Sequence, residues 1–196
     1  NWLHLHHEDF TGQFGKFWAS FRNAPWYINQ VAEAKEVAEK YGFSKVSELK
    51  LAVSKKIRDF TMGGGFLFAM CSAPDSYDVA LSAEGVDICE RMFDGDPIAS
   101  NAQVKLNYDK AFAFKDFNIE LNPMRYEISN IDIDPRTRRV KEANDLFALI
   151  EFSAKWDVIP TILTQNHERI IKSFMGQTTA FRKQFVKSSV VIMGEN

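Results

Sequence analysis

The chain has 196 residues, of which 45% are hydrophobic and 26% charged, and its formal net charge at pH 7 is −2. This composition is typical of one soluble globular domain with a sizeable core, and it excludes a disordered, collagen-like or disulfide-dense chain. Its apolar runs are far shorter than the roughly 18 residues of a membrane-spanning helix. The charge balance gives no basic field for nucleic acid.

Strand-like runs stand at both ends of the chain. The first, Trp2 to His7, follows Asn1 directly, and the second, Val190 to Met193, lies three residues before the last residue. Domains usually have polar residues at their termini. We therefore expect a fragment of a longer protein, so the absence of a signal peptide here carries little information.

Helical periodicity follows the first strand. Four aromatic residues are spaced i, i+3, i+4 and i+7 and predict one face of a helix: Phe14, Phe17, Trp18 and Phe21. A second helix is predicted at about 26–41, with Asn23 and Pro25 as start signals and Gly42 after its last turn. Its expected apolar face contains Ile28, Val31, Ala34, Val37, Ala38 and Tyr41.

A third helix is predicted at about 45–61, with Ser44 as its N-cap and Glu48 near its positive end. The residues expected in its buried stripe are Val46, Leu49, Val53, Ile57 and Phe60. The basic residues of this helix mostly lie away from that stripe; they are Lys50, Lys55, Lys56 and Arg58. We interpret them as a solvated face rather than as a nucleic-acid patch.

The next segment has the pattern of a buried strand followed directly by a helix. Gly63 to Gly65 end the third helix, and the five apolar residues Phe66 to Met70 predict a parallel strand covered on both faces. A helix is predicted at about 74–82, with Pro74 in its first turn.

The second half of the chain reads as a loop at about 85–100, an antiparallel β insertion at about 100–135 and a turn at Asp134 to Arg136. The acidic and basic residues of this turn are expected to be solvated; they are Asp132, Asp134, Arg136, Arg138 and Arg139. Further strands are predicted at Leu146 to Phe152 and Thr161 to Leu163.

Cys71 is the most informative residue for function. It stands between the buried strand and the helix with almost no connection, which is the geometry of a nucleophile elbow at the carboxyl edge of a sheet. The helix start would supply amide donors and positive potential, which favour a thiolate and can hold an oxyanion. The alternative is a small buried thiol at the end of a core strand. Cys71 and Cys89 could also form a disulfide, which the sequence alone does not decide.

The histidines give weaker signals. His4 and His6 would share one face of the first strand, with His7 on the other, and Glu8 and Asp9 follow. This run resembles the metal-binding HxH of amidohydrolase barrels and the HxHxDH of metallo-β-lactamase-like hydrolases, but the chain is too short for the barrel and the second pattern is incomplete. A polar strand end that lines a pocket is the favoured interpretation. His167 could act as a base for Cys71, although its context favours a surface position at a helix start.

Several motifs are absent, which narrows the choice of function. The chain has no GxxxxGK[ST] phosphate loop, no GxGxxG, no GxSxG and no Cys/His spacing of a zinc site.

With these residues in view, the chain resembles bacterial proteins named "asparagine synthetase B" over its full length. The resemblance rests on WLHLHHEDFTGQ at 2–13, GGGFLFAMCS at 63–72, AEGVDICE at 83–90, FMGQTTAFRK at 174–183 and IMGEN at 192–196. The chain has neither the N-terminal Cys nor the SGGxDS loop of true glutamine-hydrolysing asparagine synthetases. Its strand–Cys–helix segment instead resembles class I glutamine amidotransferase-like domains. Ala69 and Ala73 stand where those domains have glycines.

The resemblance implies one α/β domain over residues 1–196, with a doubly wound, mostly parallel, flavodoxin-like sheet and a β insertion. It implies Cys71 as nucleophile and a catalytic His beyond Asn196. Our own reading of the strand ends adds Ser72, Asp75, His6, His7 and Glu8 as pocket residues. We expect no cofactor and no metal, a small amide substrate or a protein partner, and an extracytoplasmic location. The alternative is a non-catalytic binding module, which exposed Phe17 or Trp18 would favour.

Overall fold

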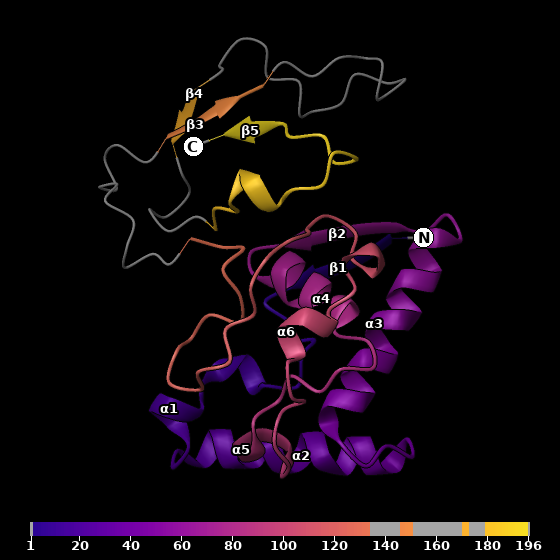
Figure 1. Ribbon diagram of the computed structural model, residues 1–196, viewed down its shortest axis with the longest axis vertical. Coiled ribbons are helices and arrows are strands. Elements are labelled where there is room, and N and C mark those ends of the chain that lie inside the picture. Colours follow the sequence, from indigo (N-terminus) through magenta and orange to yellow (C-terminus); the bar gives the residue numbers. More distant parts are fainter. Residues whose placement is uncertain (1, 134–145, 151–169, 173–178, 196) are drawn as a thin grey trace.

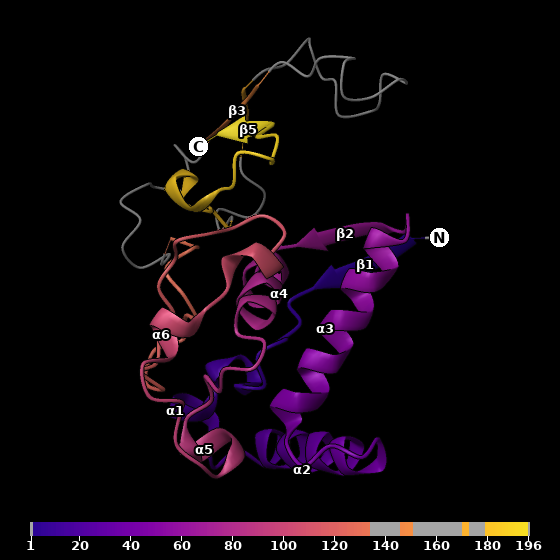
Figure 2. The same ribbon diagram turned by 45° about the vertical axis from the view of Figure 1, so that its right-hand side comes forward.

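The structure is a computed structural model that describes residues 2–133, 146–150, 170–172 and 179–195. Residues 2–133 form the main body, in which two parallel strands are combined with helices (Figure 1). A small antiparallel sheet lies above this body (Figures 1 and 2). The fold is therefore mixed α/β, as the alternating strand and helix signals predict.

The parallel sheet consists of β1 (Trp2–His6) and β2 (Phe66–Met70). The two strands pair from Trp2 opposite Phe66 to His6 opposite Met70. Helices α2 (Pro25–Lys40) and α3 (Val46–Met62) form the crossover between them, as a parallel pair requires. One face of the sheet packs against α3 and α4 (Ala73–Ser82) through Leu3, Leu5, Leu67 and Ala69.

The other face of this sheet is exposed, so the expectation that Phe66 to Met70 is covered on both faces is wrong. Phe66 is 58% and Phe68 43% exposed. His4 and His6 share this face as predicted, with ring centroids 6.4 Å apart, and His4 also stacks on Phe68 at 5.8 Å. The continuous apolar run therefore hides an alternation, in which every second residue faces the core.

The aromatic segment before α2 is not one helix. It forms a 3-10 turn, η1 (Phe14–Lys16), and a short helix, α1 (Trp18–Phe21). Phe14, Gly15 and Lys16 have φ values of 53°, 61° and 55°, which an α-helix does not allow. The aromatic residues have helical spacing in the sequence, but the positive φ values at 14–16 interrupt the helix that this spacing predicts.

Helix α2 confirms the prediction at 26–41, with Gly42 at φ +81° after its last turn. Its buried side is rotated from the predicted face. Tyr27 and Ala38 are buried, and Val31 and Ala34 pack beside them. The predicted face residues Ile28, Val37 and Tyr41 are exposed by 53%, 43% and 66%.

Helix α3 confirms the prediction at 45–61, but its N-cap is Lys45 and not Ser44. The Ser44 hydroxyl donates to the Glu48 carboxylate, which also accepts from the backbone N–H groups of Ser44 and Lys45. Val53, expected in the core, is 42% exposed. Ser54 takes the buried position because its hydroxyl donates to the Lys50 carbonyl.

Residues 83–133 contain α5 (Arg91–Asp94), α6 (Ala102–Lys105) and a 3-10 turn, η2 (Tyr108–Lys110). The expected β insertion is wrong as a sheet, since its pairing is limited to isolated bridges such as Ile119 with Ser129. Backbone bonds join Glu120 N–H to the Ile128 carbonyl and Asn130 N–H to the Asn118 carbonyl, and side chains accept from the neighbouring donors. The Gln103 amide oxygen accepts from Ile119 N–H and the Asn130 amide oxygen from Asn118 N–H.

The antiparallel sheet has β3 (Leu146–Leu149) between β4 (Ile170–Lys172) and β5 (Gly194–Glu195). The strand predicted from Leu146 is confirmed through Leu149. The strand predicted at Val190 to Met193 is wrong, because regular pairing begins at Gly194; Met193 contributes only its carbonyl, which accepts from Ile150 N–H. The predictions for Asp134 to Arg139, Thr161 to Leu163 and His167 lie outside the described residues.

Helix α4 lies at the centre of the core, and every residue in it except Pro74 is buried. Tyr77, Ala80 and Leu81 belong to the cluster under the parallel sheet. Val79 belongs to a second cluster with Phe114, Phe117 and Ile131. In the described part of the chain, helices are too short or too polar to cross a membrane.

Candidate active site at the ends of the parallel strands

Cys71 stands between the last residue of β2 and the first turn of α4, as predicted. Its φ is +54°, a left-handed conformation that costs a non-glycine residue roughly 1 kcal/mol or more. A strained turn of this kind between strand and helix is the geometry of a nucleophile elbow, which presents the side chain at the edge of the sheet. Cys71 is free and half-buried.

His7 lies at the end of the neighbouring strand. Because His6 pairs with Met70, His7 and Cys71 are the next residues along two adjacent parallel strands. His7 also has a positive φ, +58°. Its Nδ1 is 3.4 Å from the Ser72 hydroxyl oxygen, and its ring centroid is 4.1 Å from that of His6. The structure thus brings four of the predicted residues together: His6, His7, Cys71 and Ser72.

The start of α4 lies directly behind the thiol. Ser72 is the N-cap, and the first helical hydrogen bond runs from Ser76 N–H to the Ser72 carbonyl. The N–H groups of a first helical turn have no acceptor within the helix, and the helix dipole makes this end positive. An acyl oxygen that becomes negative at this position would therefore be stabilised.

Thr179 contacts the thiol from a distant part of the chain. Its Oγ1 is 3.2 Å from Cys71 Sγ. The segment that carries Thr179 pairs with residues 131–133: Ala180 N–H donates to the Asp132 carboxylate at 2.9 Å, and Ile133 N–H donates to the Ala180 carbonyl at 3.0 Å. The sequence analysis did not single out Thr179.

Asp75 lies behind the edge of the sheet. It is 5% exposed, and its carboxylate accepts a hydrogen bond from the Ser129 hydroxyl at 2.8 Å. Burial raises the pKa of Asp75 to about 7, and the nearby Asp132 and Asp78 also raise it. Asp75, predicted as a pocket-lining residue, is enclosed by the fold. Glu8 is exposed, and its carbonyl accepts from the Ser76 hydroxyl.

Asp78, one turn further along α4, connects the elbow helix to the segment 112–114. Its carboxylate accepts from the N–H groups of Phe112, Ala113 and Phe114 at 2.7–2.8 Å. Burial raises the pKa of Asp78, while these three hydrogen bonds act in the opposite direction. The segment in turn pairs with the chain end, since Lys115 N–H donates to the Phe185 carbonyl and Lys187 N–H to the Ala113 carbonyl.

An aromatic group, defined as Phe17, Phe21, Trp26 and Tyr126, extends from α1 toward the elbow. The ring of Phe17 lies 5.7 Å from Tyr126 and 6.0 Å from both Phe21 and Trp26. Partial burial raises the pKa of Tyr126, and the proximity of Cys71 raises it further. Phe17 and Trp18 are half-buried, so the exposure that would favour a binding patch is not observed for these two residues. Three other aromatic residues are exposed: Phe21, Trp26 and Tyr126, at 41%, 47% and 55%.

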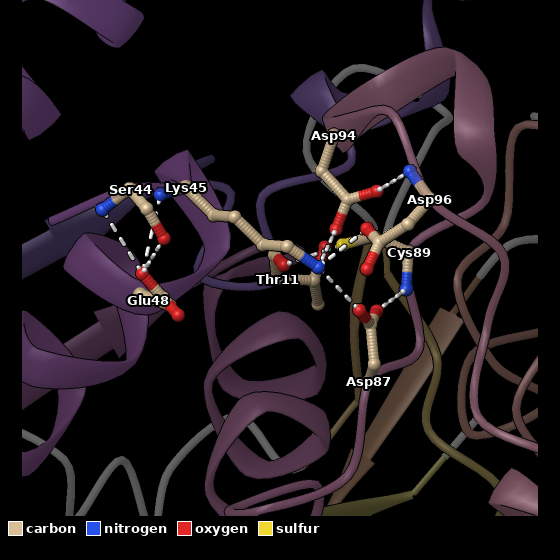
Figure 3. A network of polar contacts seen from close by, with 8 residues as sticks. All are labelled: Thr11, Ser44, Lys45, Glu48, Asp87, Cys89, Asp94 and Asp96. Carbon is tan, nitrogen blue, oxygen red and sulfur yellow. Dashed lines mark hydrogen bonds and ion pairs between the residues drawn. The ribbon is translucent and has the colours of Figure 1, made fainter.

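A second polar cluster surrounds Lys45 (Figure 3). The Lys45 ammonium lies 2.8, 3.2 and 2.5 Å from the carboxylates of Asp87, Asp94 and Asp96. Ligand atoms of Asp87, Cys89 and Asp94 lie within 4.8 Å of one another, but the ammonium already supplies a positive charge among the carboxylates. Hydrogen bonds to the carboxylates raise the pKa of Lys45. We interpret this cluster as a link between α3 and residues 87–96.

Two alternatives of the sequence analysis, a disulfide and a metal site at the histidines, receive no support. Cys89 is buried and free, its thiol donates to the Thr11 carbonyl, and Cys71 is also free, so the disulfide is not formed. The Asp9 carboxylate accepts from the Thr11 N–H and hydroxyl. Within the described ranges, the side chains close enough to share a metal include no histidine.

Comparison with known proteins adds no further assignment. No protein family matches the chain, and no curated protein or solved structure is significantly similar to it.

Proposed function

We propose that the chain is a class I amidotransferase-like domain that uses Cys71 to attack an amide carbonyl. The observation that carries this proposal is the left-handed conformation of Cys71 between β2 and α4, with φ +54°. A strain of this size persists where the surrounding structure enforces it, and such positions cluster at functional sites. His7 at the adjacent strand end and the start of α4 supply the other groups that acyl transfer needs.

The proposed reaction has two steps. Cys71 Sγ bonds to the carbonyl carbon, the amide C–N bond breaks, and the amine leaves with a proton. Water then attacks the thioester, which releases the acid and restores the thiol. The backbone N–H of Ser72 would bind the oxyanion. His7, at the adjacent strand end, is the base that we propose within the described residues, whereas the family resemblance implies a histidine further along the chain.

The resemblance also supports finer proposals. We propose that the two parallel strands are part of a doubly wound, flavodoxin-like sheet, in which active sites lie at the carboxyl ends of the strands. A small amide is the proposed substrate. We propose an extracytoplasmic location on the same resemblance alone.

A diazo-ketone analogue of glutamine tests the proposal. We expect the reduced chain to form a stoichiometric adduct at Cys71, located by peptide mass mapping, and to form less of it when glutamine is present as a competitor. Cys89 is 1% exposed and serves as an internal control that should stay unlabelled. Cys71→Ser should abolish the adduct. A Cys71 that iodoacetamide reaches but the analogue does not would rule out the amidotransferase-like activity.

The variant His7→Gln then separates the two sources of the base. If His7 exchanges the proton, adduct formation should fall by roughly tenfold or more, while iodoacetamide labelling in denaturant stays unchanged. An unaltered rate would assign the base elsewhere and leave the nucleophile in place.

A non-catalytic binding module is the second proposal, and the exposed rings of Phe21, Trp26 and Tyr126 favour it. The same labelling experiment distinguishes the two. Selective and competitive labelling supports the enzyme, and a reachable but unselective Cys71 supports the module.

A further inference from the structure

We infer that Thr179 is a positioning residue for Cys71, whose hydroxyl donates a hydrogen bond to the thiolate and sets its reactivity. The inference deepens the proposed function and rests on it for its meaning in catalysis. Its geometric basis is the 3.2 Å separation of Cys71 Sγ and Thr179 Oγ1, which joins residues 108 positions apart.

The residues that follow Thr179 are hydrogen-bonded to residues 131–133, which holds the hydroxyl in place. Ala180 N–H donates to the Asp132 carboxylate, Ile133 N–H to the Ala180 carbonyl and Arg182 N–H to the Ile131 carbonyl. The Phe181 ring packs 5.1 Å from that of Phe114. Phe114 is tied to α4 through Asp78, so the elbow helix itself anchors the segment that returns to the thiol.

Either atom can be the donor when the sulfur is a neutral thiol, but ionisation of the sulfur fixes the Thr179 hydroxyl as the donor. A neutral thiol can donate to the threonine oxygen, but a thiolate can only accept, so ionisation requires the Thr179 hydroxyl to donate. A hydrogen bond to the charged form favours that form. The thiolate, and not the thiol, is the nucleophile. Thr179 therefore acts on the reaction through Cys71 and need not touch the substrate.

The test measures alkylation of Cys71 by iodoacetamide as a function of pH in the full chain, with Thr179→Val and Thr179→Ser. Valine keeps the branched shape and removes the hydroxyl, whereas serine keeps the hydroxyl. We expect Thr179→Val to react ~10-fold more slowly at pH 7, with a pH profile displaced by about one unit to higher pH. Thr179→Ser should stay within about twofold of the parent chain.

Peptide mapping assigns the rate to Cys71, and thermal unfolding shows whether each variant is folded. An equal pH profile for Thr179→Val and the parent chain would overturn the inference, as would a loss in Thr179→Ser as large as in Thr179→Val. If Thr179→Val does not fold, the Thr179→Ala and Thr179→Ser pair gives the same comparison. This measurement needs no substrate, so its outcome is separate from that of the glutamine-analogue experiment. A pH profile that depends on the Thr179 hydroxyl, together with no adduct from the glutamine analogue, would contradict the proposed function and still support this inference.

Discussion

The two buried aspartates of α4 show how one residue type serves different purposes at neighbouring positions. Asp75 has one hydroxyl donor, from Ser129, and its pKa is raised to about 7. Asp78 has three backbone donors, which favour its ionised form against the effect of burial. With its pKa raised to about 7, Asp75 should change its charge near neutral pH.

Replacing Asp75 should change the pH dependence of stability. Between pH 4 and pH 7 the folded chain keeps a proton on Asp75 that the unfolded chain has lost, so stability falls as the pH rises through this window. Asp75→Asn cannot ionise. Relative to the parent chain, its free energy of unfolding should rise by about 2–4 kcal/mol between pH 4.5 and pH 7.5.

Urea unfolding at several pH values measures this difference. Asp59→Asn, at an aspartate that is 60% exposed, is the matched control and should leave the difference near zero. Parallel pH curves for Asp75→Asn and the parent chain would contradict the prediction.

At the scale of elements, the features predicted correctly from the sequence are those that local residue spacing determines, namely helix bounds and the junction of a strand with a helix. The bounds of α2, α3 and α4 follow from periodicity, Pro and Gly signals, and the junction at Cys71 follows from a strand that meets a helix without a loop. The break inside 14–21 was missed because residue spacing does not show the positive φ of Phe14 and Lys16. The β insertion was overpredicted because side chains of Gln103, Asn130 and Asp78 take the backbone donors that strands would pair.

Only the residues of the candidate site that are close in sequence to the two strand ends could be predicted. Cys71, Ser72, His6 and His7 lie within two short segments, so the strand ends bring them together. Thr179 joins them through pairing with residues 131–133, and no signal near position 179 points to position 71. Long-range contacts of this kind become visible only in the folded chain.

Asp78 is expected to hold the segment 112–114 against α4. Asp78→Asn places an amide N–H₂ where a carboxylate oxygen accepted, so buried backbone donors lose their acceptor at a cost of about 3 kcal/mol. Thermal and urea unfolding measure the loss, and amide exchange at residues 112–114 should accelerate. Asp116→Asn, at a side chain that is 68% exposed, should change neither. Unchanged exchange at 112–114 would show that other contacts hold this segment.

At the scale of the whole molecule, α4 connects two hydrophobic clusters. Leu81 and Val79, both 0% exposed, face the cluster under the parallel sheet and the cluster around Phe117, respectively. The main body should therefore unfold as one unit rather than as separate layers.

Leu81→Ala tests this expectation. The cavity should lower the free energy of unfolding by ~3 kcal/mol. Hydrogen exchange followed by mass spectrometry should show the same loss of protection in β1 and in residues 112–117, although Leu81 belongs to the sheet cluster alone. Val104→Ala, at a residue that is 81% exposed, is the control. Loss of protection restricted to β1 would indicate two independent units.

The burial of α4 also affects how any set of related sequences should be interpreted. Because every residue of this helix except Pro74 is enclosed, selection for folding alone would preserve its aspartates and serines, and their conservation would not indicate catalysis. Cys71 and Thr179 are only half-buried, and Cys71 adopts a backbone conformation that glycine would adopt at lower cost. Packing gives evolution little reason to retain these two residues, so their joint retention among relatives would be evidence of chemistry.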